Sequence, residues 1–311
     1  MKRDQSISRP ILVTGAHRTG TTWVGKMLAA GGDAAYISEP LNIWHRPGVL
    51  RVPTHHWYTY LCAENEAVYL PALRETLGLH YHAGAEIRSL RSLKDVMRMG
   101  RDWRIFLAGR LLRKRPLLKD PFAIFSASWF ASRLNCRVVI TVRHPAAFVS
   151  SLKRLGWPFQ FADLLDQPLL MRDRLSAYQD AMQAVPPDDV IEQGSLLWKI
   201  IYQSVAEDRK THPDYLLVRH EDLSLEPVDG FRLLYDKLGL SFNRKAEKAI
   251  LSTSSAANPG EIPSQSAHSI KVNSQANLSL WKQRLAAQEI DRVRQITADV
   301  VAEFYPEEAW E

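Results

Sequence analysis

The chain has 311 residues, 46% of them hydrophobic, so it is long enough to bury a large core in one α/β domain. Forty Lys and Arg against 34 Asp and Glu give a net charge of +6, which does not by itself predict nucleic-acid binding. The only cysteines are Cys62 and Cys136, which excludes a cysteine metal cluster or a disulfide framework and favours a reducing compartment.

Residues 1–10 are predicted to be an N-terminal tail. No apolar stretch long enough for a signal peptide or a membrane span follows them, so we expect a cytoplasmic protein, for which peripheral membrane contact stays possible. No linker, internal repeat or low-complexity tract divides the chain, which favours one domain over residues 1–311.

The first predicted strand covers residues 11–14 and is followed by a turn between Gly15 and Gly20, then by a helix over residues 21–30. Glycines let the backbone N–H groups of such a turn converge on an anion, and the helix N-terminus adds a positive dipole. The glycine spacing is that of a nucleotide-binding P-loop. However, Thr21 stands where ATP and GTP enzymes place a lysine.

The rest of the chain alternates between strand-like and helix-like patterns. The predicted strands cover residues 35–38, 117–121, 137–142 and 215–219. The predicted helices cover residues 122–134, the segment before residue 155, and residues 228–238, 244–251 and 288–304, with a mostly helical stretch up to residue 212. This alternation predicts a central parallel sheet flanked by helices, with ligands bound beyond the carboxyl ends of the strands.

Between residues 88 and 119, basic side chains recur among apolar ones, with few acids. The pattern predicts an amphipathic helix pair with a solvated basic face, the alternative being a dock for an anionic acceptor or a membrane surface. The apolar positions are Leu93, Val96, Met97, Ile105, Phe106 and Leu107.

Residues 18–23, Arg-Thr-Gly-Thr-Thr-Trp, resemble the 5′-phosphosulfate loop of sulfotransferases that use 3′-phosphoadenosine 5′-phosphosulfate (PAPS). A second segment agrees, because Arg143 ends a predicted strand and Ser151 follows on the next helix, as in the 3′-phosphate site of that family. The family commonly has an aspartate where this chain has His144, a departure that leaves both phosphate-contacting positions intact.

The resemblance implies a set of donor-binding residues. They are His17, Arg18, Thr19, Gly20, Thr21, Thr22, Trp23, Arg143, Ser151 and Lys271. The alternatives are a core position for Trp23 and a solvent-exposed lysine for Lys271. Residues 252–277, rich in Ser, Asn, Pro and Gly, are predicted to form a lid loop over the nucleotide.

Three residues are predicted to be catalytic. Arg18 would stabilise charge on the departing phosphate, and Glu39, in a Glu-Pro element like that of carbohydrate sulfotransferases, would be the general base. Lys119 would contact the sulfonate or the acceptor. Glu39 could instead tie down the strand exit or orient Arg18, and Lys119 could form an ion pair at the sheet edge. The histidines that could replace Glu39 as the base are His17, His45, His55 and His56.

The resemblance implies an enzyme that moves a sulfuryl group from PAPS to a hydroxyl or amine of a small-molecule or carbohydrate acceptor by in-line displacement. The product is 3′,5′-bisphosphoadenosine, and no metal is expected because less charge moves than in phosphoryl transfer. The alternatives are a P-loop kinase of a small molecule and a non-catalytic module that binds a nucleotide or nucleic acid. The sequence predicts neither the acceptor nor the oligomeric state.

Overall fold

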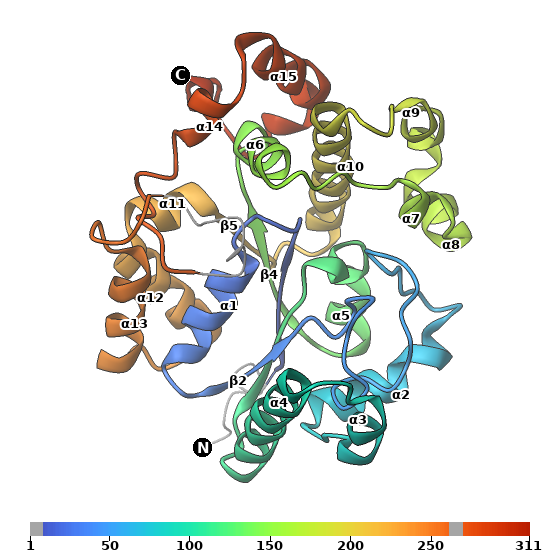
Figure 1. Ribbon diagram of the computed structural model, residues 1–311, viewed down its shortest axis with the longest axis vertical. Coiled ribbons are helices and arrows are strands. Elements are labelled where there is room, and N and C mark those ends of the chain that lie inside the picture. The colour runs from blue at the N-terminus through green and yellow to red at the C-terminus, as the bar shows by residue number, and fades with distance from the viewer. Residues whose placement is uncertain (1–8, 261–269) are drawn as a thin grey trace.

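A parallel sheet of five strands, in the order β2-β3-β1-β4-β5, forms the centre of the molecule (Figure 1). The computed structural model describes residues 9–260 and 270–311. The strands are β1 Ile11–Gly15, β2 Ala34–Ser38, β3 Arg115–Lys119, β4 Arg137–Val142 and β5 Leu216–Arg219. The prediction of a parallel α/β fold is therefore confirmed.

Strand β1 lies in the middle of the sheet and is buried on both faces. Successive side chains of a strand point to opposite faces, so Ile11 and Val13 pack into one core and Leu12 into the other. The first core is covered by α1 Thr21–Ala30, α11 His220–Leu225, α12 Pro227–Leu238 and α13 Arg244–Ser254. The second is covered by α5 Ala127–Arg133, α6 Pro145–Leu155, α10 Val190–Thr211 and α15 Ala287–Val301.

The remaining helices lie in the connections. Between β2 and β3 these are α2 Glu66–Leu77, α3 Ala83–Ser89 and α4 Leu93–Leu111, which lie together in the lower part of Figure 1. Between α6 and α10 they are α7 Ala162–Leu165, α8 Pro168–Leu170, a π-helix Met171–Leu175, a 3-10 turn Ser176–Tyr178 and α9 Gln179–Ala184. Near the C-terminus they are α14 Leu280–Arg284 and a 3-10 turn Glu307–Trp310.

The helix predicted over residues 122–134 is divided into two elements. A 3-10 helix covers Pro121–Ser126 and is followed by α5. Asp120 starts the first of them, because its Oδ1 accepts a hydrogen bond from Phe122 N at 3.0 Å and its Oδ2 accepts one from Leu41 N at 2.6 Å. The Asx turn at Asp120 thus fastens the tip of β3 to the segment that follows β2.

The apolar side chains named for the predicted helix pair over residues 88–119 are mostly not buried. Only Phe106 of the six is buried, whereas Leu93, Val96, Met97 and Leu107 are exposed. Helix α4 packs on the edge strand β2 along a narrow face, where a Cβ on Gly109 would come within 2.9 Å of the Ala35 Cβ. The solvated face of this helix is therefore apolar as well as basic.

Two predicted segments fall partly outside the described residues, namely the tail over residues 1–10 and the lid loop over residues 252–277. The described ends of that loop are joined by a hydrogen bond from Val272 N to Thr253 O at 3.2 Å and one from Asn273 N to Pro259 O at 2.8 Å. None of the helices in the described part of the chain combines the length and the apolar character needed to cross a membrane.

Candidate active site

The carboxyl ends of four strands meet at one edge of the sheet, and each is followed by or ends in a predicted site residue. These residues are Arg18 after β1, Glu39 after β2, Lys119 at the end of β3 and Arg143 after β4. The parallel register places Ser38 beside Lys119 and Gly15 beside Thr141. The sheet therefore brings together side chains that are far apart in the sequence.

The turn after β1 requires both of its glycines. Gly15 has φ 146°, and a Cβ there would lie 2.4 Å from the carbonyl oxygen of Thr141. Gly20 has φ 94°, and a Cβ there would lie 2.7 Å from Nδ1 of His220. Thr19 fastens the turn from inside, because its Oγ1 is 2.7 Å from Oγ1 of Thr141. The backbone of the turn is thus held in one conformation.

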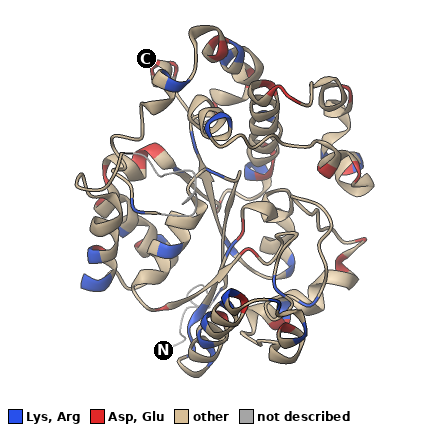
Figure 2. Cartoon of the chain, viewed as in Figure 1, with Lys and Arg blue, Asp and Glu red and all other residues tan. Residues whose placement is uncertain are grey.

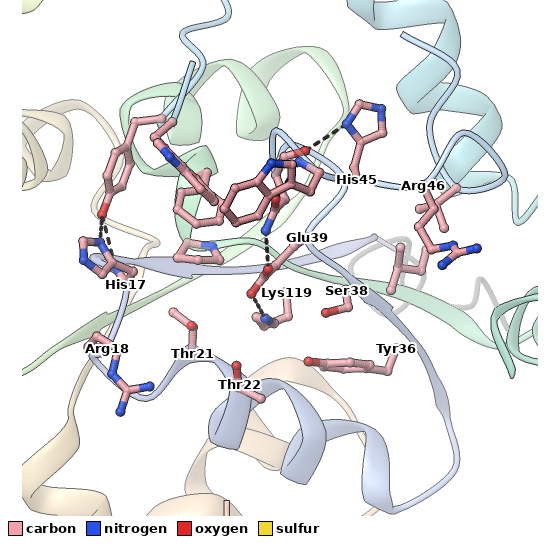
Figure 3. Close-up of a pocket in the computed structure, with 18 of the residues that line it drawn as sticks. His17, Arg18, Thr21, Thr22, Tyr36, Ser38, Glu39, His45, Arg46 and Lys119 are labelled. Carbon is pink, nitrogen blue, oxygen red and sulfur yellow. Dashed lines mark hydrogen bonds and ion pairs between the residues drawn. The ribbon is translucent and has the colours of Figure 1, made fainter. Parts of the chain in front are cut away.

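Helix α1 begins at this turn and directs its N-terminus toward a cavity lined by Thr21 and Thr22 (Figure 3). Among the described residues, no side chain caps this N-terminus and no acidic side chain lies in its first turn. The first N–H groups of a helix have no partners within the helix, and they carry the positive end of its dipole. This arrangement can bind an anion through backbone donors.

A cluster of arginines adjoins the turn. Arg143 Nη1 donates to the carbonyl oxygen of Arg18 at 3.2 Å, and Arg18 Nε donates to Ser151 Oγ at 3.2 Å. The Arg18 guanidinium also lies over the ring of Trp157, 5.6 Å from its centroid. Burial, followed by the charges of Arg143 and Arg154, lowers the pKa of Arg18 to about 10. Cations that repel one another in this way are stabilised by a bound anion.

Arg143 is itself buried, and burial lowers its pKa. Its Nε is buried and finds no hydrogen-bond acceptor within the described residues. A buried donor without an acceptor costs free energy, so the site fits a ligand that supplies acceptor oxygens. The next residue, His144, is turned away, because its ring stacks on Trp281 at 5.2 Å and its backbone N–H donates to Glu221 Oε1 at 3.0 Å.

Glu39 and Lys119 form an ion pair that faces the same cavity. Glu39 Oε1 pairs with Lys119 Nζ, and Glu39 Oε2 accepts a hydrogen bond from Asn42 Nδ2 at 2.8 Å. Figure 3 places this pair across the cavity from Thr21 and Thr22. The ion pair foreseen as the alternative role of Lys119 is therefore present, and it positions the carboxylate of Glu39 at the cavity wall.

The cavity has a volume of about 1130 Å³ and is walled largely by aromatic rings. The rings that line it are Tyr36, Trp44, Trp57, Tyr58, Phe106, Phe122, Trp157 and Phe159. Arg98 and Arg101 of α4 also line it. A molecule in the cavity would therefore meet both aromatic rings and polar side chains, the latter including the carboxylates of Glu39, Asp102 and Asp163 and several cations.

Two of the four candidate histidines, His17 and His45, line the cavity, whereas His55 and His56 are not among its lining residues. The backbone N–H of His17 donates to the Tyr58 hydroxyl at 3.2 Å, and its Nδ1 is 2.6 Å from the same oxygen. Burial, followed by the charge of Arg18, lowers the pKa of His17 to about 4. At neutral pH the ring of His17 is therefore uncharged.

Six of the ten predicted donor-binding residues are not among those that line the cavity, namely Thr19, Gly20, Trp23, Arg143, Ser151 and Lys271. Thr19, Gly20, Arg143 and Ser151 belong to the turn after β1 and to the arginine cluster beside it, whereas Trp23 and Lys271 lie elsewhere. Trp23 is buried in the first core, where its Nε1 donates to Thr253 Oγ1 at 3.0 Å and its ring meets Phe231 edge-on at 5.2 Å. Lys271 is exposed. For Trp23, the structure contains the core packing foreseen as its alternative role.

The sequence analysis did not identify His220 as a site residue. Its Nδ1 is buried without a partner in the part of the chain that the structure describes, and its ring meets Trp23 edge-on at 5.7 Å. Burial, followed by the charges of Arg143 and Arg18, lowers its pKa to about 3. The sequence could have indicated His220 through its position directly after β5, because the other site residues also follow strands at this edge of the sheet.

Comparison with known proteins shows which family the chain belongs to. A model of the sulfotransferase family matches residues 10–244. The sulfotransferase domain from the curacin biosynthetic pathway is 14% identical, with a TM-score of 0.46 over 93% of this chain and 98% of that one. The sulfotransferase domain of the Synechococcus PCC 7002 olefin synthase is 17% identical, with a TM-score of 0.42 over 98% of this chain and 99% of that one.

A mouse sulfotransferase solved in complex with PAP, which is 3′,5′-bisphosphoadenosine, is 12% identical to this chain. Its TM-score is 0.45 over 96% of this chain and 85% of that one. No curated protein sequence matches the chain significantly.

Proposed function

The chain belongs to the sulfotransferase family, and from this premise we propose that it transfers a sulfuryl group from PAPS to a hydroxyl or amine of an acceptor bound in the aromatic cavity. The observation that carries the proposal is the contact of Arg143 Nη1 with the carbonyl oxygen of Arg18. It joins the anion-binding turn to the buried arginine site, as a donor with phosphates at both ends of one adenosine requires.

The residues present fit this donor. Its 5′-phosphate would accept hydrogen bonds from the first N–H groups of α1 and from the hydroxyls of Thr21 and Thr22. Its 3′-phosphate would supply the acceptor oxygens that the buried Nε of Arg143 lacks among the described residues. Ser151, already in contact with Arg18, would complete this second site.

The donor, when bound, supplies an activated sulfuryl group on a phosphate leaving group. The bond from sulfur to the phosphate oxygen breaks while the acceptor oxygen bonds to sulfur, and the acceptor proton passes to the Glu39 carboxylate. Arg18 stabilises the negative charge that remains on the leaving phosphate, an interaction that strengthens as the bond breaks. Lys119 holds Glu39 at the cavity wall and adds a positive charge beside the reacting group.

The cavity favours an acceptor with a bulky apolar body over a bare sugar. Aromatic rings bury apolar surface well, and seven of them line the cavity besides Tyr36. The hydroxyl or amine of such an acceptor would lie at the Glu39 end of the cavity.

Transfer of radiolabelled sulfate tests the proposal. The protein is incubated with labelled PAPS and a panel of hydrophobic alcohols, phenols, amines and sugars, and the products are separated by chromatography. We expect labelled products from hydrophobic acceptors and stoichiometric 3′,5′-bisphosphoadenosine. Turnover of ATP with no binding of PAPS would contradict the proposal and favour a kinase.

A further inference from the structure

Helix α4 turns an apolar face to solvent. Leu93 is 84% exposed, Met97 75% and Leu111 73%, and Val96 and Leu107 are exposed beside them. With 3.6 residues per turn, these five positions fall on one side of the helix. An outward apolar stripe of this length is unusual on a protein surface that meets only water.

The opposite side of α4 is fixed to the fold. Phe106 and Gly109 are its buried residues, and a Cβ on Gly109 would come within 2.9 Å of the Ala35 Cβ of β2. Because this close contact sets the rotation of the helix, the apolar stripe cannot turn inward without leaving the sheet. The apolar stripe therefore stays on the outside of the folded protein.

Cations surround the stripe. Residues 88–114 contain nine Lys or Arg and two Asp, and Figure 2 shows the basic positions along this part of the chain. Both aspartates already form ion pairs: Asp95 pairs with Arg46 at 3.4 Å, and Asp102 pairs with Arg101 at 2.8 Å. The basic residues are Arg88, Arg91, Lys94, Arg98, Arg101, Arg104, Arg110, Arg113 and Lys114. By the same helical geometry Arg104 falls within the stripe, and Arg98 and Arg101 line the cavity, so the remaining cations flank the stripe or lie at its two ends.

The same helix borders the cavity of the candidate active site. Arg98, Arg101 and Ile105 of α4 line the cavity, while the apolar stripe faces the outside. Trp44, also a lining residue, is 77% exposed and meets Trp57 edge-on at 5.1 Å. Exposed aromatic and apolar side chains are typical of a protein that inserts shallowly into the interface of a bilayer.

We propose that the α4 surface, defined as the apolar stripe Leu93, Val96, Met97, Leu107 and Leu111 with its border of cations, docks on an anionic lipid bilayer. The apolar side chains enter the interface, and the cations contact acidic headgroups. A second copy of this chain fits less well, because a two-fold pairing of this surface would bring cations against cations. Docking would bring the cavity next to a source of hydrophobic acceptors.

Sedimentation with vesicles tests the proposal. The full chain is mixed with phosphatidylcholine vesicles that contain either no acidic lipid or roughly 30% phosphatidylglycerol, at about 0.1 M and about 0.5 M NaCl. We expect binding to the acidic vesicles at least about tenfold stronger than to the neutral ones, and weaker at high salt. Equal binding to both vesicles, or binding to neither, would overturn the proposal.

A pair of double variants identifies the surface. Met97→Asp with Leu111→Asp should lower vesicle binding about tenfold or more, because it places charge in the apolar stripe. The matched control, Leu233→Asp with Leu251→Asp, changes side chains that are 54% and 52% exposed on α12 and α13, and should bind like the unchanged protein. Both should keep the circular dichroism spectrum, since the positions are exposed.

Retained binding in the α4 variant would overturn the proposal. So would a dimer of the unchanged protein in gel filtration that the α4 variant converts to a monomer, because a second copy would then cover this surface. The assay contains no PAPS and measures binding alone, so its failure would leave the proposed sulfuryl transfer untouched.

Discussion

Arg143, directly after β4, donates a hydrogen bond from Nη1 to the carbonyl oxygen of Arg18 over 3.2 Å, so the buried guanidinium is tied directly to the turn that follows β1. The two residues are 125 positions apart in the chain, and the pairing of β1 with β4 brings them together. This contact joins the segment around Arg18 and the segment around Arg143 into one cationic site. The predictions below test the parts of that site.

The first prediction concerns Gly20. Replacement by Ala would strain a backbone with φ 94° and push a Cβ to 2.7 Å from His220 Nδ1, so the turn must shift. We expect a loss of about 1–3 kcal/mol in the free energy of unfolding, together with weaker binding of 3′,5′-bisphosphoadenosine. Urea denaturation and calorimetric titration measure the two effects.

Gly32 offers a matched control, because it has φ 101° but no atom within 4 Å of the position of an added Cβ. Gly32→Ala should cost only the backbone strain, about 1 kcal/mol, and should leave ligand binding unchanged. If both variants bind the nucleotide equally well, the turn at Gly20 does not hold the donor.

The second prediction concerns the general base. Glu39→Gln keeps the shape of the side chain but removes the proton acceptor, so we expect kcat to fall roughly 10²- to 10⁴-fold while bisphosphoadenosine binds as before. Asp163 is the control, because it also lines the cavity but its Oδ1 accepts a hydrogen bond from Trp57 N at 3.1 Å. If Asp163→Asn lowers the rate as much as Glu39→Gln does, then Glu39 is not the base.

The third prediction separates two adjacent serines of α6. Ser151 Oγ accepts a hydrogen bond from Arg18 Nε at 3.2 Å, whereas the buried Oγ of Ser150 has no partner among the described residues. Ser151→Ala should weaken the binding of bisphosphoadenosine about five- to twentyfold, and Ser150→Ala should not change it. Equal affinities of the two variants in calorimetric titration would remove Ser151 from the site.

The fourth prediction concerns stability in acid. Burial lowers the pKa of His144 from 6.5 to about 3. Below about pH 6.5 the His144 ring is therefore protonated in the unfolded chain but stays neutral in the folded chain. The free energy of unfolding consequently falls as the pH falls toward 3. His144→Phe removes this contribution, so the variant should lose less stability between pH 6.5 and pH 4 than the unchanged protein does.

Urea denaturation at a series of pH values measures this slope. His17 and His220, with their pKa values lowered to about 4 and about 3, act in the same direction, so part of the slope should remain. His55→Phe changes an exposed ring and serves as the control. A slope that is the same in the His144→Phe variant and in the unchanged protein would mean that His144 is not buried as a neutral ring.

Local pattern was enough to predict the strand tips and the turn. The sequence predicts strands before Arg18, Glu39 and Arg143 because short apolar runs there end in glycine, proline or charge, and the structure places β1, β2 and β4 at those runs. The helix over residues 21–30 is also confirmed, with Gly31 directly after it. These features depend on residues close together in the chain.

Features that depend on distant partners could not be predicted. The position of β3 between β2 and β1 follows from the packing of the whole sheet, and so does the approach of His220 to Gly20. Tyr58 reaches His17 from a connection without a recognisable pattern. On α4, periodicity identified an amphipathic helix, but only its contact with β2 decides which face is buried.

Binding of 3′,5′-bisphosphoadenosine compared with adenosine 5′-phosphate is the most direct test of the central claim, measured by calorimetric titration. The unchanged protein should prefer the bisphosphate about ten- to a hundredfold, and Arg143→Ala should abolish the preference. Arg137→Ala, at the opposite end of β4, should keep it. Equal affinity of the unchanged protein for both nucleotides, or an intact preference in Arg143→Ala, would contradict the account.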